Sequence, residues 1–309
     1  MNKHITLLSA LFLLQLVVTG LLFSADSAME NTNVSQALVS MKQDELNKVQ
    51  IIAENTELTL IKRNDRWRLE GYPKLPLAES KVAAVTDKLI RSQVTWPVTN
   101  TQSSHERFKV ANDSFEKHII YTDSSGERQA LLLGKSPSFK QLYVRNSEQD
   151  EVFSIEFSAY QLSTEIDDWL DKTLLSVDGI SQISHAAISL AKRDEKWQLV
   201  PPSTLGEQQT LDSENIQELV NQLTSLSVSG LANNTPKPVD KLIVHDDQGQ
   251  EYIYSFASNE DSYFVKREDI NQWFTLSKRK FDKLANLSLD KFISKVGIQE
   301  ENSEEKVSE

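Results

Sequence analysis

The chain contains nearly the same eight-residue segment twice. KRNDRWRL fills Lys62–Leu69, and KRDEKWQL fills Lys192–Leu199, 130 residues further along. In both copies a stretch of alternating apolar and polar residues leads to a polar pair. A second, shorter stretch that contains the tryptophan follows this pair. Alternation with a period of two is typical of a half-buried strand. Each copy therefore predicts a β-hairpin, with its turn at Asn64-Asp65 or Asp194-Glu195.

The likeness continues into the segment after each hairpin. LAESKVAAVTDKLIRS in the first copy and LDSENIQELVNQLTSL in the second place apolar residues at i, i+3 and i+7, which predicts an amphipathic helix. Asp212 is expected to cap the second helix, because its carboxylate can accept from the first free backbone N–H groups. The residues expected to face the core are Val82, Val85 and Leu89 in the first copy, and Ile216, Leu219 and Leu223 in the second.

Further matches follow in the same order along both copies. FEKHIIYTDSSGER (115–128) and VDKLIVHDDQGQEY (239–252) each predict a strand, a turn with glycine and the start of another strand. The longest difference is TNTQSSHERFKVANDS (99–114), which TPKPVD replaces in the second copy. The later matches are Val144-Arg145 with Val265-Lys266, Phe153 with Phe274, Tyr160 with Phe281, and Leu170-Asp171-Lys172 with Leu289-Asp290-Lys291.

These matches predict a tandem duplication of one α+β domain. Each copy is expected to have the element order β-β-α-β-β-β-β-α, in which helices pack on one face of an antiparallel sheet. The first domain is predicted to span residues 46–177 and the second 178–297, with a boundary near Ser176–Gly179. A charged tail without aromatic residues, 298–309, is expected to be disordered.

The N-terminal segment is strongly apolar. Ile5–Phe23 contains no charged residue, and as a helix its nineteen residues span about 28 Å, close to the hydrocarbon thickness of a bilayer. A cleaved signal peptide, with Ala25 and Ser27 at its site, and a retained anchor both fit. The apolar run exceeds the usual signal-peptide core, which favours an anchor over residues 1–23 and a polar stalk over 24–45. Lys3 before the span predicts that the bulk of the chain is exported.

Charge and cysteine content limit the partners and the chemistry. The net charge of −12 argues against a nucleic-acid partner, since phosphates require a basic face. The chain has no cysteine, so disulfides, thiolate nucleophiles and cysteine-based metal sites are excluded.

Candidate catalytic and ligand-binding residues each have a structural explanation. None of the five histidines (His4, His105, His118, His185 and His245) lies in a metal-binding spacing. Asp167 and Asp168 are expected on the solvated face of a helix, and Asp246-Asp247 in a turn. Ser184 and His185 are neighbours in a predicted strand and so point to opposite faces. No catalytic, cofactor-binding or metal-ligating residue is therefore assigned, and no cofactor is expected.

Trp67 and Trp197 are the residues most suited to lining a glycan or peptide groove. Each alternates in step with a strand leucine, Leu69 or Leu199, which places both indoles on the core side. The interpretation favoured by this pattern is core packing.

Several segments resemble the uncharacterised bacterial proteins grouped as domain of unknown function 4340. The residues that carry the resemblance are the short N-terminal apolar span, ELTLIKRNDRWRL, YPKLPLAESKV and ERQALLLGKSPSFKQLYVRNSEQDEVFSI, which together lie largely within Val49 to Leu226. This chain departs from the family pattern at Lys109-Val110, where a Gly-Leu pair is common. The resemblance implies an envelope-facing accessory partner of ABC-type export systems related to gliding-motility transporters, and it carries over no catalytic residue.

The function expected from the sequence is that of a non-enzymatic accessory protein. It is predicted to be anchored in the bacterial inner membrane by one helix, with its bulk in the periplasm, and to assemble with the membrane subunits of an ABC transporter. Two alternatives remain: a periplasmic module that binds an envelope glycan or peptide between its domains, and an enzyme whose site is assembled from scattered carboxylates.

Overall fold

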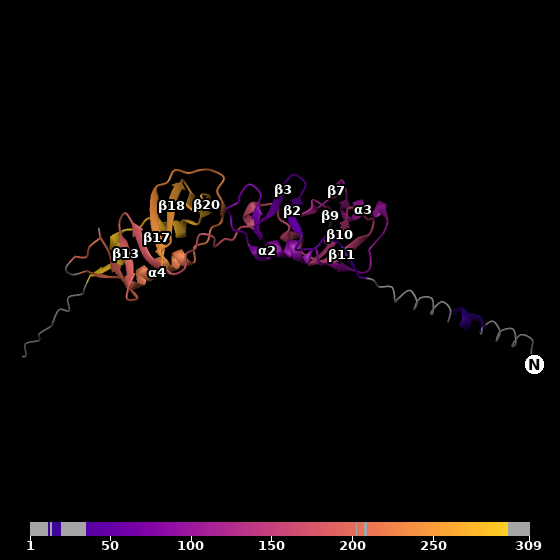
Figure 1. Ribbon diagram of the computed structural model, residues 1–309, viewed down its shortest axis with the longest axis horizontal. Coiled ribbons are helices and arrows are strands. Elements are labelled where there is room, and N and C mark those ends of the chain that lie inside the picture. Colours follow the sequence, from indigo (N-terminus) through magenta and orange to yellow (C-terminus); the bar gives the residue numbers. More distant parts are fainter. Residues whose placement is uncertain (1–11, 13, 20–34, 202, 207–208, 296–309) are drawn as a thin grey trace, which may run out of the picture. The chain divides into compact units, whose positions relative to one another are not determined.

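The computed structural model describes residues 12, 14–19, 35–201, 203–206 and 209–295 (Figure 1). Grouped by their contacts, the residues form two compact units: Met1–Glu57 with Ala83–Leu162, and Leu58–Val82 with Ser163–Glu309. The limits 46–177 and 178–297 mark the repeat in the sequence. Contacts divide the chain by its packing and not by its sequence repeat, so those limits stay a prediction.

The first large sheet has seven strands in the order β4-β3-β2-β8-β9-β10-β11. Its neighbouring strands run antiparallel, for example β2 against β8 and β10 against β11. The β10–β11 ladder places Val144 opposite Phe153. The strands are β2 (Leu46–Ile52), β3 (Glu57–Arg63), β4 (Arg66–Leu69), β8 (Lys117–Asp123), β9 (Arg128–Leu133), β10 (Gln141–Asn146) and β11 (Val152–Glu156).

The second large sheet repeats this order and adds one strand, giving β14-β13-β12-β17-β18-β19-β20-β16. Val265 lies opposite Phe274, as Val144 lies opposite Phe153, so the two sheets also agree in register. This agreement is what two copies of one module predict. The strands are β12 (Ile180–His185), β13 (Ser189–Arg193), β14 (Lys196–Leu199), β16 (Gly230–Leu231), β17 (Asp240–Asp246), β18 (Glu251–Asn259), β19 (Ser262–Arg267) and β20 (Trp273–Leu276).

The predicted α+β class with antiparallel sheets is confirmed, but the predicted element order is wrong in two places. The first error is a missing strand, because β2 and β12 precede the hairpins and lie inside their sheets. In β2, Val49 and Ile51 are buried alternately, which is a visible strand signal. In β12, an irregularity of register between Ile180 and Gln182 breaks the alternation.

The second error is the last helix of the first copy. The second copy has α5 (Lys278–Leu284), and the side chain of Ser277 caps it by accepting from the backbone N–H of Lys280. The first copy forms only two 3₁₀ turns, η3 (Ala159–Gln161) and η4 (Ile166–Asp168), and Ser158 before η3 makes no such bond. As a result Tyr160 is 94% exposed, whereas its sequence match Phe281 is 4% exposed in the core.

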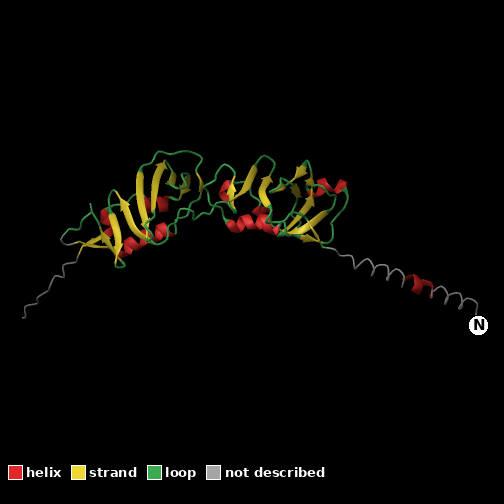
Figure 2. Ribbon diagram, viewed as in Figure 1, coloured by secondary structure: helices red, strands yellow, loops and turns green. Residues whose placement is uncertain are grey.

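The helix that follows the tryptophan hairpin lies below the strands in each copy in the view of Figure 2. In the first copy, α2 (Glu79–Ala83) continues as the π-helical turn η1 (Ala84–Lys88), and Val82, Val85 and Leu89 are buried. In the second copy, α4 (Ser213–Thr224) packs Ile216, Leu219 and Leu223 into the same core as sheet residues such as Val244 and Val265. Asp212 accepts from the N–H groups of Glu214 and Asn215, so the predicted cap is confirmed.

Short elements complete the description. The segment 99–114, which the second copy lacks, folds into η2, α3, β6 and the first residue of β7, and we call it the insertion. The short elements are β1 (Gln36–Ala37), β5 (Gln93–Val94), η2 (Gln102–Ser104), α3 (His105–Phe108), β6 (Val110–Ala111), β7 (Ser114–Phe115), β15 (Gln209–Leu211), η5 (Leu289–Phe292) and β21 (Ile293–Lys295).

The predicted anchor (1–23), part of the stalk (24–45) and the tail (298–309) lie largely or wholly outside the described residues. Of the anchor, residues 12 and 14–19 are described; they are helical and exposed. Within the part of the chain that the structure covers, no helix is both long enough and apolar enough to cross a membrane.

Both predicted hairpin turns are confirmed, and they suggest a stabilising change. Asp65 and Glu195, each the second residue of its turn, have φ of 59° and 60°. A side chain other than glycine is strained there by about 1 kcal/mol. We expect Glu195→Gly to raise the free energy of unfolding by about 0.5–1 kcal/mol in urea titrations. The control Lys196→Gly, one residue later in β14, should lower it by a similar amount; a destabilised Glu195→Gly would contradict the turn geometry.

Candidate functional site

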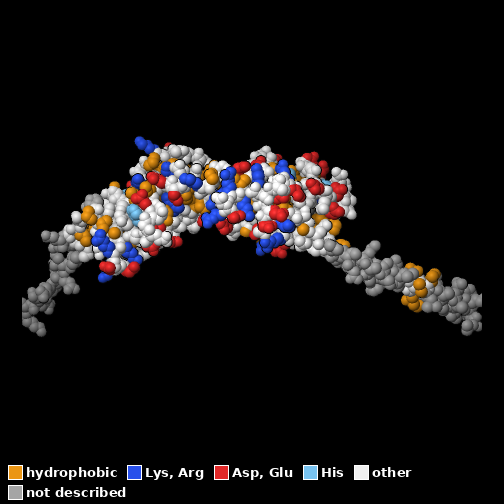
Figure 3. Space-filling model, viewed as in Figure 1, with side chains coloured by type: hydrophobic (Ala, Val, Ile, Leu, Met, Phe, Trp, Pro, Cys, Tyr) orange, Lys and Arg blue, Asp and Glu red, His pale blue; other side chains and the backbone are white. Residues whose placement is uncertain are grey.

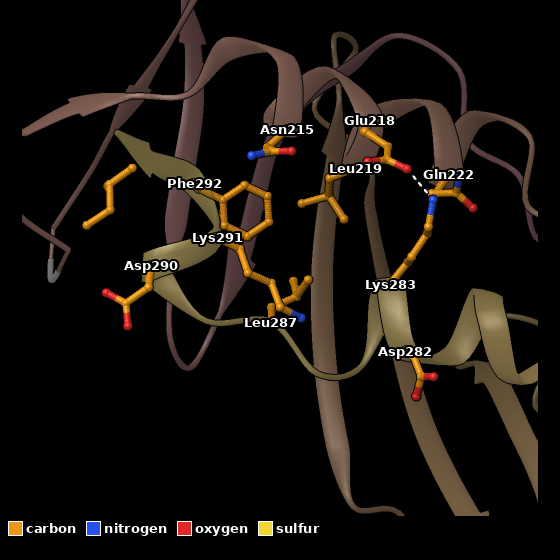
Figure 4. Close-up of a pocket in the computed structure, with 11 residues that line it drawn as sticks. Asn215, Glu218, Leu219, Gln222, Asp282, Lys283, Leu287, Asp290, Lys291 and Phe292 are labelled. Carbon is orange, nitrogen blue, oxygen red and sulfur yellow. Dashed lines mark hydrogen bonds and ion pairs between the residues drawn. The ribbon is translucent and has the colours of Figure 1, made fainter. Parts of the chain in front are cut away.

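The first candidate site is a pocket of about 340 Å³ in the second unit, between α4, α5 and η5 (Figure 4). Its apolar lining includes Leu219, Leu287 and Phe292. The first of these is a core residue of α4, and the other two follow α5 as the chain turns back toward β21. The polar lining residues are Asn215, Glu218, Gln222, Asp282, Lys283, Asp290 and Lys291.

Charges of both signs surround this pocket. Lys283 of α5 reaches across to Glu218 of α4 and forms an ion pair with it, drawn as the dashed line in Figure 4. The hydrogen bond from Lys283, together with its positive charge, lowers the pKa of the Glu218 carboxyl. This carboxylate is held as an anion by a neighbouring cation, which suits a structural link between the two helices better than proton transfer.

A second pocket, of about 390 Å³, lies in the first unit beside the insertion. Ile120, Ala130 and Leu132 give it an apolar lining from β8 and β9, and His118 and Arg128 come from the same strands. Asn112 of the insertion, with Ser147 and Glu148 of the β10–β11 turn, completes the lining. The sequence did not predict this pocket, because it needs the insertion to fold back beside the sheet.

Arg145 holds the insertion in place and is only 3% exposed. Its Nε donates to the carbonyl oxygen of Val110 at 2.8 Å, and its Nη2 donates to Oδ1 of Asn112. Nη1 donates to the carbonyl oxygens of Asn146, Ser147 and Gln149 at 3.3, 3.2 and 2.7 Å. One guanidinium thus joins the insertion to the turn after β10.

A close backbone approach also holds the insertion against the sheet. Gly134 lies against the chain at Phe108, and a Cβ on this glycine would lie 2.0 Å from the Phe108 carbonyl oxygen. The aromatic ring of Phe108 packs edge-on to Tyr143 of β10, with 4.6 Å between ring centroids. Phe108 and Val110 are therefore part of a small separate core with Leu132 and Val152 of the sheet.

Three of the described histidines bind neighbouring groups of the fold. The ring of His105 is hydrogen-bonded through Nε2 to the carbonyl oxygen of Asp150 at 2.9 Å. His185 pairs through Nε2 with the carboxylate of Asp240, also at 2.9 Å, and its Nδ1 accepts from the N–H of Ala187. Nε2 of His245 lies 3.5 Å from a carboxylate oxygen of Glu251. His4 lies outside the described residues.

His118 makes no such contact through Nε2. This atom is buried and has no hydrogen-bond partner among the residues that the structure describes, and the same holds for Nδ1 of His245. Burial lowers the pKa of His118, and the positive charge of Arg128 lowers it further. The imidazole is therefore held in its neutral form beside the second pocket.

This depressed pKa predicts a pH dependence of stability. With a folded-state pKa below the unfolded value of about 6.5, the contribution of His118 is complete above that pH and is lost as the pH falls through the folded-state pKa. Urea unfolding at about pH 7.5 and about pH 5.5 should therefore show a smaller acid-induced loss of stability for His118→Gln than for the unchanged chain. Equal losses would contradict the prediction.

The two predicted acidic pairs differ in their roles. Asp246 caps its turn as predicted, because its Oδ1 accepts from the N–H groups of Gln248 and Gln250. Asp167 corrects the prediction of a solvated side chain: its Oδ1 accepts from the backbone N–H of Leu231 at 2.6 Å, and its carboxylate lies where a side chain on Gly230 would be. Asp168 is exposed, as predicted.

The two hairpin tryptophans occupy the same register position, Trp67 opposite Lys62 and Trp197 opposite Lys192. Trp197 packs against the core of the second unit, as predicted. Trp67 is half-buried. Neither residue lines the pockets described above.

Over the described ranges, no group of three or more His, Asp or Glu residues could hold a metal ion. No curated protein and no solved structure matches the chain. The family model described as Domain of unknown function (DUF4340) matches residues 67–243, from β4 of the first copy to β17 of the second. Since this range covers more than half of the 309 residues, the chain belongs to the family of Domain of unknown function (DUF4340).

Proposed function

We propose that the chain is a non-enzymatic accessory protein, anchored in the bacterial inner membrane, that assembles with membrane subunits of an ABC-type transport system. The folded units would lie in the periplasm, after the predicted span of residues 1–23. The anchor is an expectation from the apolar run Ile5–Phe23, and the partner class comes from the resemblance of the sequence to accessory proteins of such transporters.

The observation that supports a non-enzymatic role is how the buried polar side chains are used. Arg145 donates hydrogen bonds to oxygen atoms of the insertion, of Asn146 at the end of β10 and of the turn that follows. Arg267 pairs with the carboxylate of Asp269 and donates to the carbonyl oxygen of Ser176. His105 and His185 are bound to Asp150 and Asp240. Groups held this way stabilise the fold, whereas an acid or base of a catalytic site must face a reacting atom.

Affinity purification tests the proposed assembly. The full chain, with an affinity tag after Glu309, is solubilised from membranes in mild detergent, and the bound proteins are identified by mass spectrometry. We expect a permease and an ATPase subunit of one transporter. The matched control carries an unrelated single membrane span in place of residues 1–23, which separates capture by the folded units from capture by the anchor. Recovery of neither subunit with the unchanged chain would overturn the proposal.

The alternative of a periplasmic module that binds a glycan or peptide between the two domains stays a prediction. The two pockets described above each lie within one unit, so neither bears on it.

A further inference from the structure

Three aromatic side chains of the first unit are exposed to an unusual degree. Trp96 is 69% exposed, Phe139 is 88% exposed and Tyr160 is 94% exposed. Aromatic rings contribute large apolar areas, and native proteins commonly bury them. Three rings left in solvent within one unit therefore indicate a surface that something else covers. We call Trp96, Phe139 and Tyr160 the aromatic edge.

The three residues lie around one edge strand, β11. The chain from β5 to Thr99 runs beside β11, because the N–H of Val98 donates to the carbonyl oxygen of Val152 and Thr99 bridges the same residue. Trp96 belongs to this segment. Phe139 lies two residues before β10 and Tyr160 four residues after β11, and the pairing of Gln141 with Glu156 shows that these two strands meet at that end. Phe139 and Tyr160 therefore leave the sheet at the same end.

The second copy provides an internal comparison, and it lacks these features. The position of Tyr160 is taken by Phe281, which is buried in the core. The turn between β18 and β19 carries Glu260 and Asp261 where the first copy has the longer loop with Phe139. Gly230 of β16, the strand that pairs with β20, follows the second helix as Trp96 follows the first. The aromatic edge is thus a property of the first copy and not of the shared fold.

The segments that carry the aromatic edge are basic although the chain is acidic, and Asp87, Glu156 and Glu165 lie directly beyond their ends. The three segments that carry its aromatic residues, 88–98, 134–140 and 157–164, contain four cations and no Asp or Glu, on a chain of net charge −12. Over the face in view in Figure 3, acidic and basic side chains are interspersed on each unit. Nζ of Lys140 lies 5.3 Å from the ring centroid of Phe139. The four cations, all exposed, are Lys88, Arg91, Lys135 and Lys140.

Exposed aromatic rings beside cations match the chemistry of a bilayer interface with anionic headgroups. Tryptophan and tyrosine prefer the headgroup level, and lysine and arginine are attracted to anionic lipids. The path of the chain points to the same partner. β1 pairs with β5 through Gln36 and Val94, two residues from Trp96. Between the predicted span, which ends at Phe23, and β1 lie twelve residues, which reach at most about 40 Å when fully extended.

We propose that the aromatic edge of the first unit binds the headgroup region of an anionic bilayer and so holds this unit against the membrane. This proposal rests on the membrane anchor of the proposed function, but not on the transporter partner. A lipid-bound edge would supply the second attachment that a singly anchored domain needs for a fixed orientation.

The chain has no cysteine, which makes a site-specific test direct. Single cysteines replace Trp96, Phe139 or Tyr160 in the full chain, and each is labelled with an environment-sensitive dye. The labelled protein is reconstituted into vesicles of phosphatidylcholine and phosphatidylglycerol, with or without lipids that carry a quencher at the headgroup level. Control cysteines replace Val239 and Glu260, which are exposed residues of the second unit.

We expect quencher lipids to reduce the emission at positions 96, 139 and 160 at least twofold, and to leave positions 239 and 260 unchanged. In vesicles of phosphatidylcholine alone the effect should weaken, because the four cations lose their anionic partners. Equal emission at all five positions would overturn the proposal. Dyes that become shielded only in native membranes would also overturn it, because a protein would then be what covers the aromatic edge. Release of the whole chain from the vesicles would overturn the anchor as well, whereas loss of the transporter partner would leave this assay unaffected.

Discussion

Replacing Arg145 by methionine is expected to lower the free energy of unfolding of the first unit by about 3–4 kcal/mol. The substitution keeps most of the apolar stem but removes every hydrogen bond of the guanidinium. Carbonyl oxygens of Val110, Ser147 and Gln149 and the amide of Asn112 would lose their donor. A buried acceptor left without a partner costs about 1–3 kcal/mol, so several such losses outweigh any gain from removing a buried charge.

Amide hydrogen exchange of the full chain measures where this loss occurs. The insertion, residues 99–114, and the turn after β10 should lose protection first, because Arg145 connects only these segments. Lys266→Met is the matched control, because Lys266 holds the register position of Arg145 in the second copy. Arg145 lies opposite Leu132 of the neighbouring strand, and Lys266 lies opposite Ser255. Lys266 reaches one polar partner, Asn271 at 3.4 Å, so a loss below about 1 kcal/mol is expected. Equal losses for the two variants would show that Arg145 has no such role.

Phe153→Ala and Phe274→Ala are expected to cost about 3–5 kcal/mol each, and to cost similar amounts. Phe153 is 1% exposed and Phe274 is fully buried, and each lies opposite a valine of the neighbouring strand. Truncation leaves a cavity in the same place of each sheet. Urea titration gives the size of the loss, and hydrogen exchange should assign it to the first unit for Phe153 and to the second for Phe274.

Ser154→Ala is the control for this pair, because Ser154 is an exposed neighbour on β11 and should change stability by less than about 0.5 kcal/mol. A phenylalanine variant that behaves like Ser154→Ala would mean that the two copies do not share a core position. Loss of protection in the wrong unit would lead to the same conclusion.

The sequence predicted those parts of the fold in which local chemistry decides the structure. The polar pairs Asn64-Asp65 and Asp194-Glu195 take positive φ, as the two-residue hairpin turns require. The apolar spacing of the helix after each hairpin placed Val85 and Leu219 in the core. Matching residue by residue also made Val144 equivalent to Val265 and Phe153 equivalent to Phe274, and the structure places each valine opposite the phenylalanine of its own copy.

Where the sequence failed, distant contacts decide the structure. β12 contains a register irregularity at Ile180 and Gln182, so its buried residues do not alternate strictly. The segment after β11 has helix-like apolar spacing, but Asp167 bonds to Leu231 and the indole Nε1–H of Trp169 donates to the carbonyl oxygen of Ser163. These bonds favour two 3₁₀ turns over the helix that the pattern predicted.

The candidate sites could not be predicted from the pattern of residues. Arg145 is a single charged residue in an apolar strand, and only the folded insertion shows which oxygen atoms it binds. The pocket beside His118 combines residues of β8 and β9 with Asn112 of the insertion. The aromatic edge is formed by three separate segments, and the length of the loop before β10 gives no sign that Phe139 is exposed.

The central claim is that one sheet-and-helix module occurs twice in this chain. A crystal structure of the full chain tests it most directly, by superposing the first seven-stranded sheet on the second. The account predicts that the strands superpose in the order β4-β3-β2-β8-β9-β10-β11 on β14-β13-β12-β17-β18-β19-β20, with Trp67 on Trp197 and Phe153 on Phe274. Tryptophan hairpins at different positions of two unlike sheets would contradict it.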